Sequence, residues 1–107
     1  MQLLKIYYAY FSPGNTTEKV VSHIASSFQN YPVESINLTD YATRQEDYYF
    51  KENELLIIGV PAYGGRVPAP VVDALRHFTG SNTPVVLVAT YGNRDIDDTL
   101  IELKEKM

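Results

Sequence analysis

The chain has 107 residues and no cysteine, and its thirteen Asp and Glu residues outnumber its nine Lys and Arg residues, giving a net charge of −4. This length fits one domain over residues 1–107, and the acidic balance argues against nucleic acid as the main partner, because phosphate binding needs a clustered basic surface. The lack of cysteine excludes disulfides and thiolate metal sites. The longest apolar runs, Leu55–Val60 and Val85–Ala89, are too short to cross a membrane. We therefore expect a cytoplasmic protein.

Four apolar runs, taken in chain order, predict the strands of one sheet: Leu3–Tyr10, Val33–Asn37, Leu55–Val60 and Val85–Thr90. All but the weaker second run are continuously apolar rather than alternating, which is typical of parallel strands covered on both faces. Apolar residues at helical spacing predict helices over Thr17–Phe28, Pro70–Phe78 and Asp95–Met107. The polar stretch Leu38–Glu54 fits either a short helix or an irregular connection. This alternation of strands and helices predicts an α/β fold with right-handed crossovers and a parallel sheet.

Ligands of open parallel sheets bind at the carboxyl ends of the strands, so the loops after the three strong strands are the candidate sites. The first loop, residues 12–17, reads Ser-Pro-Gly-Asn-Thr-Thr and opens a helix. Its backbone N–H groups and the helix dipole can converge on one anion, with hydroxyls of Ser12, Thr16 and Thr17 as further donors. Gly14 and Asn15 are the residues that best tolerate a positive φ. The alternative is a Pro-Gly turn in which Thr16 or Thr17 only caps the helix.

The second and third loops both pair a tyrosine with glycine. The second loop, residues 61–68, contains Tyr63, Gly64, Gly65 and Arg66, so it offers an aromatic face, a backbone that can approach a flat ligand, and a cation. The third loop, residues 90–95, contains Tyr91, Gly92, Asn93, Arg94 and Asp95, of which Asn93 or Asp95 can also cap a following helix. Together the three loops predict a phosphate cradle beside two Tyr-Gly segments, which suits a phosphorylated planar aromatic cofactor.

Classical catalytic and metal-binding patterns are not found in the sequence. His23 and His77 lie in predicted helices without a neighbouring nucleophile, and we interpret both as structural. The spacing of His, Asp and Glu fits no metal site, and the glycine motifs that bind nucleoside triphosphates and dinucleotides are missing. We therefore predict no catalytic residues and no metal.

The segments Tyr10–Lys19, Pro61–Pro68 and Tyr91–Asp95 resemble the flavodoxin domain of the bacterial and archaeal flavodoxin–ferredoxin fusion proteins, and the resemblance runs over essentially the whole chain. It implies a flavodoxin-like three-layer fold, FMN as cofactor and low-potential electron transfer. By position, the residues implied to contact the phosphate are Ser12, Gly14, Asn15, Thr16 and Thr17. Those implied to line the two sides of the flavin ring are Tyr63, Gly64, Gly65 and Arg66 on one side, and Tyr91, Gly92, Asn93 and Asp95 on the other.

The chain departs from that family in two places. The usual phosphate loop reads Ser-x-Thr-Gly-x-Thr, whereas Gly14 and Asn15 stand here where Thr and Gly are expected, which removes one hydroxyl donor. The family's fifth strand and closing helix have no counterpart in the predicted elements. We therefore expect a sheet of order 2-1-3-4 that lacks the fifth strand, either because the domain is incomplete at its C-terminus or because a partner chain supplies that strand. Val85–Thr90 would otherwise be an exposed edge open to homo-oligomer formation.

The functional prediction is an FMN-binding electron-transfer flavoprotein, a carrier rather than an enzyme, working with a redox partner protein of ferredoxin type. One alternative is a flavodoxin-like binding or assembly module without flavin. A second alternative is a small FMN-dependent reductase, for which the short chain leaves little room.

Overall fold

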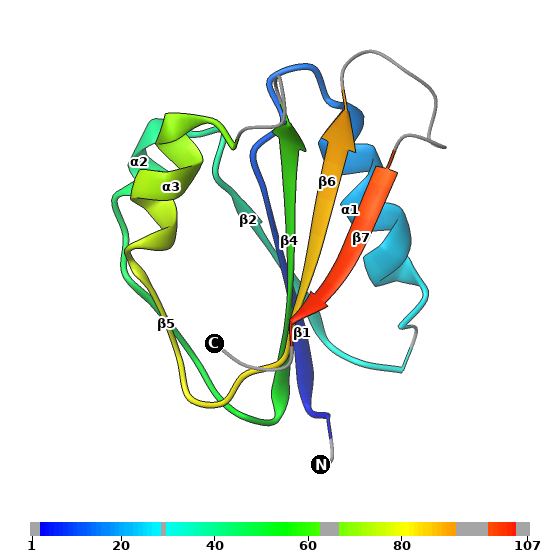
Figure 1. Ribbon diagram of the computed structural model, residues 1–107. Coiled ribbons are helices and arrows are strands. Elements are labelled where there is room, and N and C mark those ends of the chain that lie inside the picture. Colours follow the sequence, from blue (N-terminus) through cyan, green and yellow to red (C-terminus); the bar gives the residue numbers. More distant parts are fainter. Residues whose placement is uncertain (1–2, 29, 63–66, 92–98, 105–107) are drawn as a thin grey trace.

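The computed structural model describes residues 3–28, 30–62, 67–91 and 99–104; for Ala62, Tyr91 and 99–104 it describes the backbone only. Five strands form the main sheet, in the order β2-β1-β4-β6-β7 (Figure 1). They are β1 (Lys5–Tyr10), β2 (Val33–Asn37), β4 (Glu54–Ala62), β6 (Val85–Tyr91) and β7 (Thr99–Lys104). The first four are mutually parallel, and they are the four predicted strands in the predicted order.

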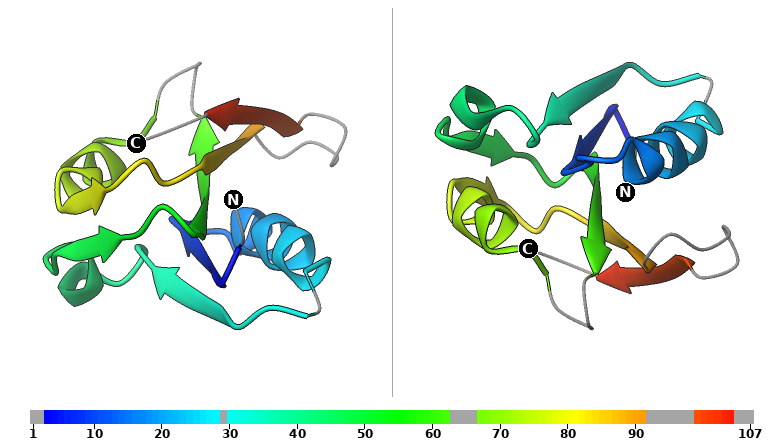
Figure 2. Two further views of the ribbon diagram at one scale, coloured as in Figure 1. Left: turned by 90° about the horizontal axis from the view of Figure 1, so that it is seen from below. Right: turned by 90° about the horizontal axis from the view of Figure 1, so that it is seen from above.

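Helices cover both faces of this sheet, as Figure 2 shows. One face is covered by α1 (Thr16–Ser26). The other face carries α2 (Tyr41–Arg44) and α3 (Ala69–Leu75), together with a small parallel sheet of β3 (Tyr48–Phe50) and β5 (Phe78–Gly80). The predicted α/β class with a parallel sheet in three layers is therefore confirmed. The polar stretch after β2 holds both a short helix and a short strand. The helix predicted over Pro70–Phe78 ends earlier, at Leu75, and Phe78 begins β5 instead.

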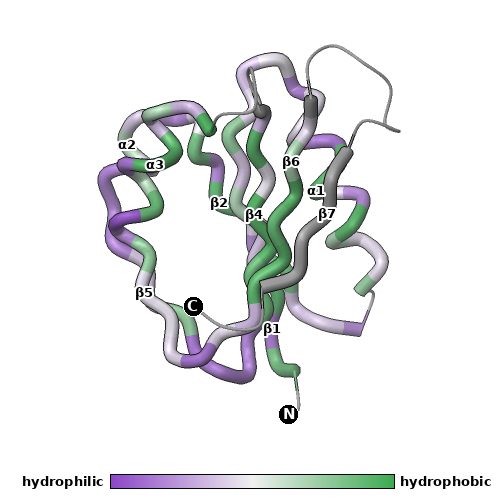
Figure 3. Tube along the Cα trace, in the orientation of Figure 1, coloured by the Kyte–Doolittle hydropathy of each residue, from purple (hydrophilic) through white to green (hydrophobic). Residues whose placement is uncertain are grey.

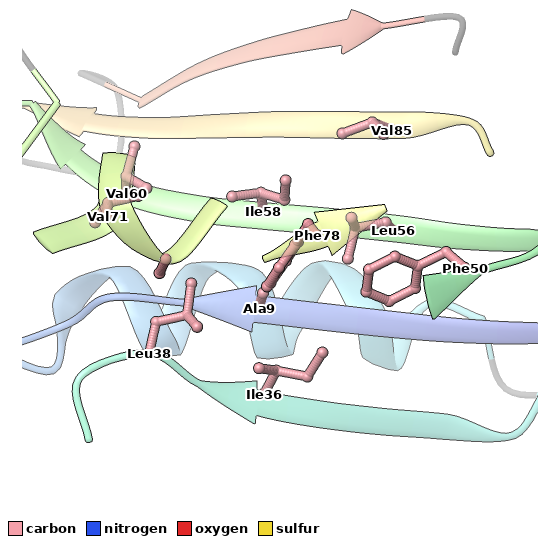
Figure 4. Packing of buried hydrophobic residues seen from close by; sticks show 11 residues of the cluster. Ala9, Ile36, Leu38, Phe50, Leu56, Ile58, Val60, Val71, Phe78 and Val85 are labelled. Atoms are coloured by element: carbon pink, nitrogen blue, oxygen red, sulfur yellow. The ribbon is translucent and has the colours of Figure 1, made fainter. Parts of the chain in front are cut away.

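Two hydrophobic clusters fill the spaces between the layers, because successive strand residues point to opposite faces of the sheet. On β4, Leu55 and Ile57 face α1, while Leu56, Ile58 and Val60 face α3 and the small sheet of β3 and β5. Figure 4 shows the cluster that contains Leu56, Ile58 and Val60. The predicted apolar stripe of α1 is confirmed, since Val20, Val21 and Ala25 are buried and Ile24 and Phe28 pack against them. In Figure 3 the central strands β4 and β6 are largely apolar, and the outer connecting segments are more polar.

The end of the chain corrects two expectations. Residues 99–104, predicted to be helical, form β7, which pairs antiparallel with β6 from Thr90 opposite Thr99 to Val85 opposite Lys104. The chain thus supplies a fifth strand itself, and Val85–Thr90 is an inner strand rather than an exposed edge. The physical reason is that β6 would otherwise present a row of unpaired N–H and C=O groups, and pairing them outweighs a helical spacing of apolar residues.

None of the helices in the described ranges has the length and apolar character needed to span a bilayer.

Candidate functional site

The carboxyl ends of the four parallel strands lie at one edge of the sheet, uppermost in Figure 1. The first loop follows β1 there, and the second and third loops follow β4 and β6. Ala62 and Tyr91 are register partners on β4 and β6, so these two loops leave the sheet from adjacent positions. The predicted residues Tyr63, Gly64, Gly65, Arg66, Gly92, Asn93 and Asp95 lie outside the described residues.

The first loop turns sharply at Asn15, whose φ of 67° is in the left-handed region. Its N–H donates to the carbonyl of Ser12 at 3.1 Å, which closes the turn. An asparagine adopts this conformation more readily than most residues with a Cβ. The positive φ predicted for Gly14 or Asn15 is therefore found at Asn15, where the family pattern has its glycine.

The capping of α1 leaves part of its first turn open. Asn15 is the N-cap residue, yet its side chain makes no capping hydrogen bond. Instead the Ser12 hydroxyl oxygen accepts the N–H of Glu18 at 2.9 Å. Within the described ranges, no residue accepts the backbone N–H of Thr16 or Thr17. These two N–H groups sit at the positive end of the helix dipole, which is the arrangement that binds anions.

Two of the predicted phosphate-binding residues already make hydrogen bonds inside the protein, although the Ser12 hydroxyl does so only as an acceptor and keeps its own O–H. The Thr17 hydroxyl shares a 2.8 Å hydrogen bond with the Thr90 hydroxyl, and both side chains are buried. Ser12 is buried as well, and its backbone N–H donates to Thr39 Oγ1 at 2.8 Å. Of the five predicted residues, Gly14, Asn15 and Thr16 are exposed, whereas Ser12 and Thr17 are buried and hydrogen-bonded.

The loop after β2 contributes residues that the sequence reasoning missed. Besides accepting from Ser12, Thr39 donates its N–H to Asn37 Oδ1 at 3.0 Å. Arg44 donates to the carbonyls of Leu38 and Thr39 at 3.0 and 3.1 Å, and its guanidinium lies 5.8 Å from the centre of the Phe11 ring. The signal in the sequence was the set of turn-forming residues Asn37, Thr39 and Asp40 at the end of a strand.

The pKa values of two ionisable groups near this edge are shifted from their ordinary values. Burial, followed by the nearby Glu18 carboxylate, raises the pKa of Tyr10, the last residue of β1, so its hydroxyl stays protonated. The hydroxyl and backbone N–H of Thr43 lower the pKa of Asp40, whose carboxylate caps α2. The first loop contains no Lys or Arg, so the donors that this loop itself offers to an anion are neutral.

Other parts of the described surface have fewer groups that could bind a ligand or a metal. A shallow hollow lies between the two short helices, lined by Tyr41, Arg44, Gln45, Ala69, Pro70 and Asp73. His77 Nδ1 lies 2.7 Å from Asp47 Oδ1, and His23 is exposed on α1. Among the described residues, no group of three or more His, Asp or Glu side chains could hold a metal ion.

Comparison with known proteins identifies neither a matching family model nor a matching solved structure. A stretch of 62 residues is similar to ribonuclease Z of Staphylococcus aureus, with 42% identity in strains MSSA476 and MW2 and 40% in strain JH9. The similarity covers 52% of this chain and 20% of each ribonuclease Z. The chain thus spans about a fifth of the length of the curated relatives it matches.

Proposed function

We propose that the protein is an FMN-binding electron-transfer flavoprotein of the flavodoxin-like kind. The main support for the proposal is the first turn of α1. The N–H groups of Thr16 and Thr17 have no acceptor among the described residues, while the Ser12 hydroxyl accepts the N–H of Glu18. A flavin phosphate accepts such neutral donors well, since its oxygens are strong acceptors and the helix dipole favours negative charge.

The chemistry of the loop residues fits this group. Gly14 faces open space, because a Cβ built on it would meet no atom within 4 Å, and Asn15 and Thr16 beside it are exposed. We assign phosphate contact to these three residues and to the first-turn N–H groups. Tyr63, Gly64, Gly65 and Arg66 would line one side of the flavin ring, and Tyr91, Gly92, Asn93 and Asp95 the other. When bound, the flavin supplies the redox chemistry, and the protein binds and orients it.

The proposed role includes a redox partner protein, of ferredoxin type by the family resemblance, and a cytoplasmic location. Proteins that exchange electrons meet through small, weak interfaces, so we expect this contact to be transient. The likeness to ribonuclease Z does not lead us to propose ribonuclease activity. It covers a fifth of those proteins, and an RNA substrate would call for a basic surface, whereas acidic residues outnumber basic ones here.

The competing proposal is a binding or assembly module that holds no flavin. One observation favours it, namely that the Thr17 hydroxyl is already hydrogen-bonded to the Thr90 hydroxyl in the interior of the protein. The two proposals differ in a direct measurement, because only the first requires flavin binding.

The test is a titration of the purified protein with FMN, followed by flavin fluorescence and by the visible spectrum. We expect quenching and a spectral shift that saturate at one equivalent. Tyr91→Ala should weaken binding about tenfold by removing an aromatic contact. Tyr49→Ala is the matched control, because Tyr49 lies on β3 with 74% of its surface exposed. A folded wild-type protein that leaves the flavin spectrum unchanged would refute the proposal, and equal binding by Tyr91→Ala would refute the ring contact.

A further inference from the structure

We infer that Thr39 and Thr90, which lie outside the first loop, are positioning residues that hold the loop in its phosphate-binding shape. This inference rests on the proposed function. It concerns two side chains at the ends of β2 and β6, the strands that lie on either side of the β1–β4 pair.

Thr90 fixes the start of α1. Its hydroxyl and that of Thr17 are 2.8 Å apart, although the two residues are 73 positions apart in the chain. Thr90 is 6% and Thr17 2% exposed, so water does not compete for this bond. The methyl group of Thr17 lies over Gly59 of β4, where an added Cβ would be 3.0 Å from Thr17 Cγ2. Thr17 is thus held on one side by β4 and on the other by β6.

Thr39 fixes the opposite end of the loop. Its Oγ1 accepts the N–H of Ser12 at 2.8 Å, and Ser12 in turn accepts the N–H of Glu18 through its own hydroxyl. Thr39 is itself held by the Asn37 side chain, which accepts its N–H, and by Arg44, which donates to its carbonyl. A chain of hydrogen bonds therefore runs from the loop after β2, through Ser12, to the first turn of α1.

These two attachments matter because the loop has no cation. When the loop offers only neutral N–H and O–H donors, its affinity for phosphate depends on how well these donors point at the phosphate oxygens. A loop that already has its bound conformation also loses less conformational entropy on binding. If Thr39 or Thr90 cannot form its bond, the loop can take other shapes, and the donors that converge on the phosphate then diverge. Thr39 follows β2, which precedes neither ring-binding loop. Thr90 does precede the third loop, but its hydroxyl bonds Thr17 of the first loop, so the loss should fall mainly on phosphate recognition.

The experiment compares FMN with riboflavin, which has the same ring and no phosphate. Thr39→Val and Thr90→Val remove the hydroxyl with little change in shape, and Thr39→Ser and Thr90→Ser restore it. Thr79→Val is the control, because Thr79 is an exposed strand residue of β5. We expect both valine variants to bind FMN about tenfold more weakly, since the loss of one or two hydrogen bonds has this size, and to bind riboflavin within about twofold of wild type. The serine variants should recover most of the FMN affinity.

Melting temperatures of the flavin-free variants show whether each one folds. Thr90→Val leaves the buried Thr17 hydroxyl without a partner, and if this unfolds the variant, Thr39→Val still tests the inference. Wild-type FMN affinity in both valine variants overturns the inference, and so does an equal loss of FMN and riboflavin binding, which would indicate general destabilisation. If the wild-type protein binds neither flavin, the proposed function fails and the inference fails with it. That failure is distinguishable because it is seen before any substitution is made.

Discussion

Gly59 of β4 lies directly beneath Val21 of α1, so closely that a Cβ on the glycine would overlap Val21 Cγ1. The same Cβ would be 3.0 Å from Thr17 Cγ2 in the first turn of the helix. The absence of a side chain at Gly59 therefore lets the N-terminal half of α1 pack closely against β4, next to the first loop.

Gly59→Ala should destabilise the protein by about 1–3 kcal/mol, because an extra methyl group in a packed interface forces the helix away from the sheet. Urea unfolding measures this difference. Gly14→Ala is the control, since a Cβ there meets no atom within 4 Å, and its midpoint should stay close to that of the wild type. Equal unfolding midpoints for Gly59→Ala and wild type would mean that α1 does not lie as closely on β4 as the structure has it.

Asn15→Ala should destabilise the protein by about 1 kcal/mol, because alanine tolerates a φ of 67° less well than asparagine. Asn15→Gly should be as stable as wild type, since glycine adopts positive φ without strain. Asn82 provides a matched control, because its φ is 57° and it lies before β6, at the other end of the sheet. Asn82→Ala should lose similar stability in urea unfolding. If FMN binds as proposed, only the Asn15→Ala substitution should also weaken FMN binding, and a similar loss in Asn82→Ala would contradict the placement of the site.

Those parts of the structure with strong local patterns could be predicted from the sequence. Three continuous apolar runs and one weaker run identified the four parallel strands, and the spacing of Val20, Val21 and Ala25 identified the buried face of α1. Strands β3 and β5 have three residues each, too few for a periodic pattern. They pair because Tyr48, Phe50 and Phe78 pack together over the sheet, a contact that depends on the folded chain.

The misassigned end of the chain and the missed site residues have a common physical origin. Apolar residues at Leu100 and Leu103 suit a helix, but the open edge of β6 offers hydrogen bonds that no local pattern records. Thr39 and Thr90 make their bonds to residues 27 and 73 positions away. A single threonine carries no signal for such a partner, so only the three-dimensional structure shows it.

Removing residues 99–107 should cause self-association, because it exposes the backbone groups along β6 that pair with β7. Light scattering after size-exclusion chromatography should show a mass that rises with concentration for the shortened chain. A chain lacking only residues 105–107 keeps β7 and should behave like the full chain. A shortened chain that stays monomeric over the same concentration range would argue against this pairing.

Asp40 predicts a dependence of stability on pH. Its carboxylate accepts the N–H and hydroxyl of Thr43 at 3.1 and 2.8 Å, and these bonds lower its pKa below the ordinary value of 3.8. Since the folded state favours the ionised form, this contribution is fully present above the ordinary pKa and is lost as the pH falls through the lowered one. The difference in unfolding free energy between wild type and Asp40→Ala should therefore be largest near pH 7 and shrink below about pH 4.

Asp40→Asn separates charge from hydrogen bonding at this helix cap, because asparagine keeps an acceptor oxygen but does not ionise. The gap between Asp40→Asn and Asp40→Ala should stay constant from pH 7 to about pH 3, since neither side chain titrates. The experiment is urea unfolding of the three proteins at stepped pH. A wild-type advantage that persisted unchanged at low pH would show that the cap works through shape alone. Because Asp40 caps the helix whose Arg44 holds the carbonyl of Thr39, acidification should also loosen the loop that supports Ser12.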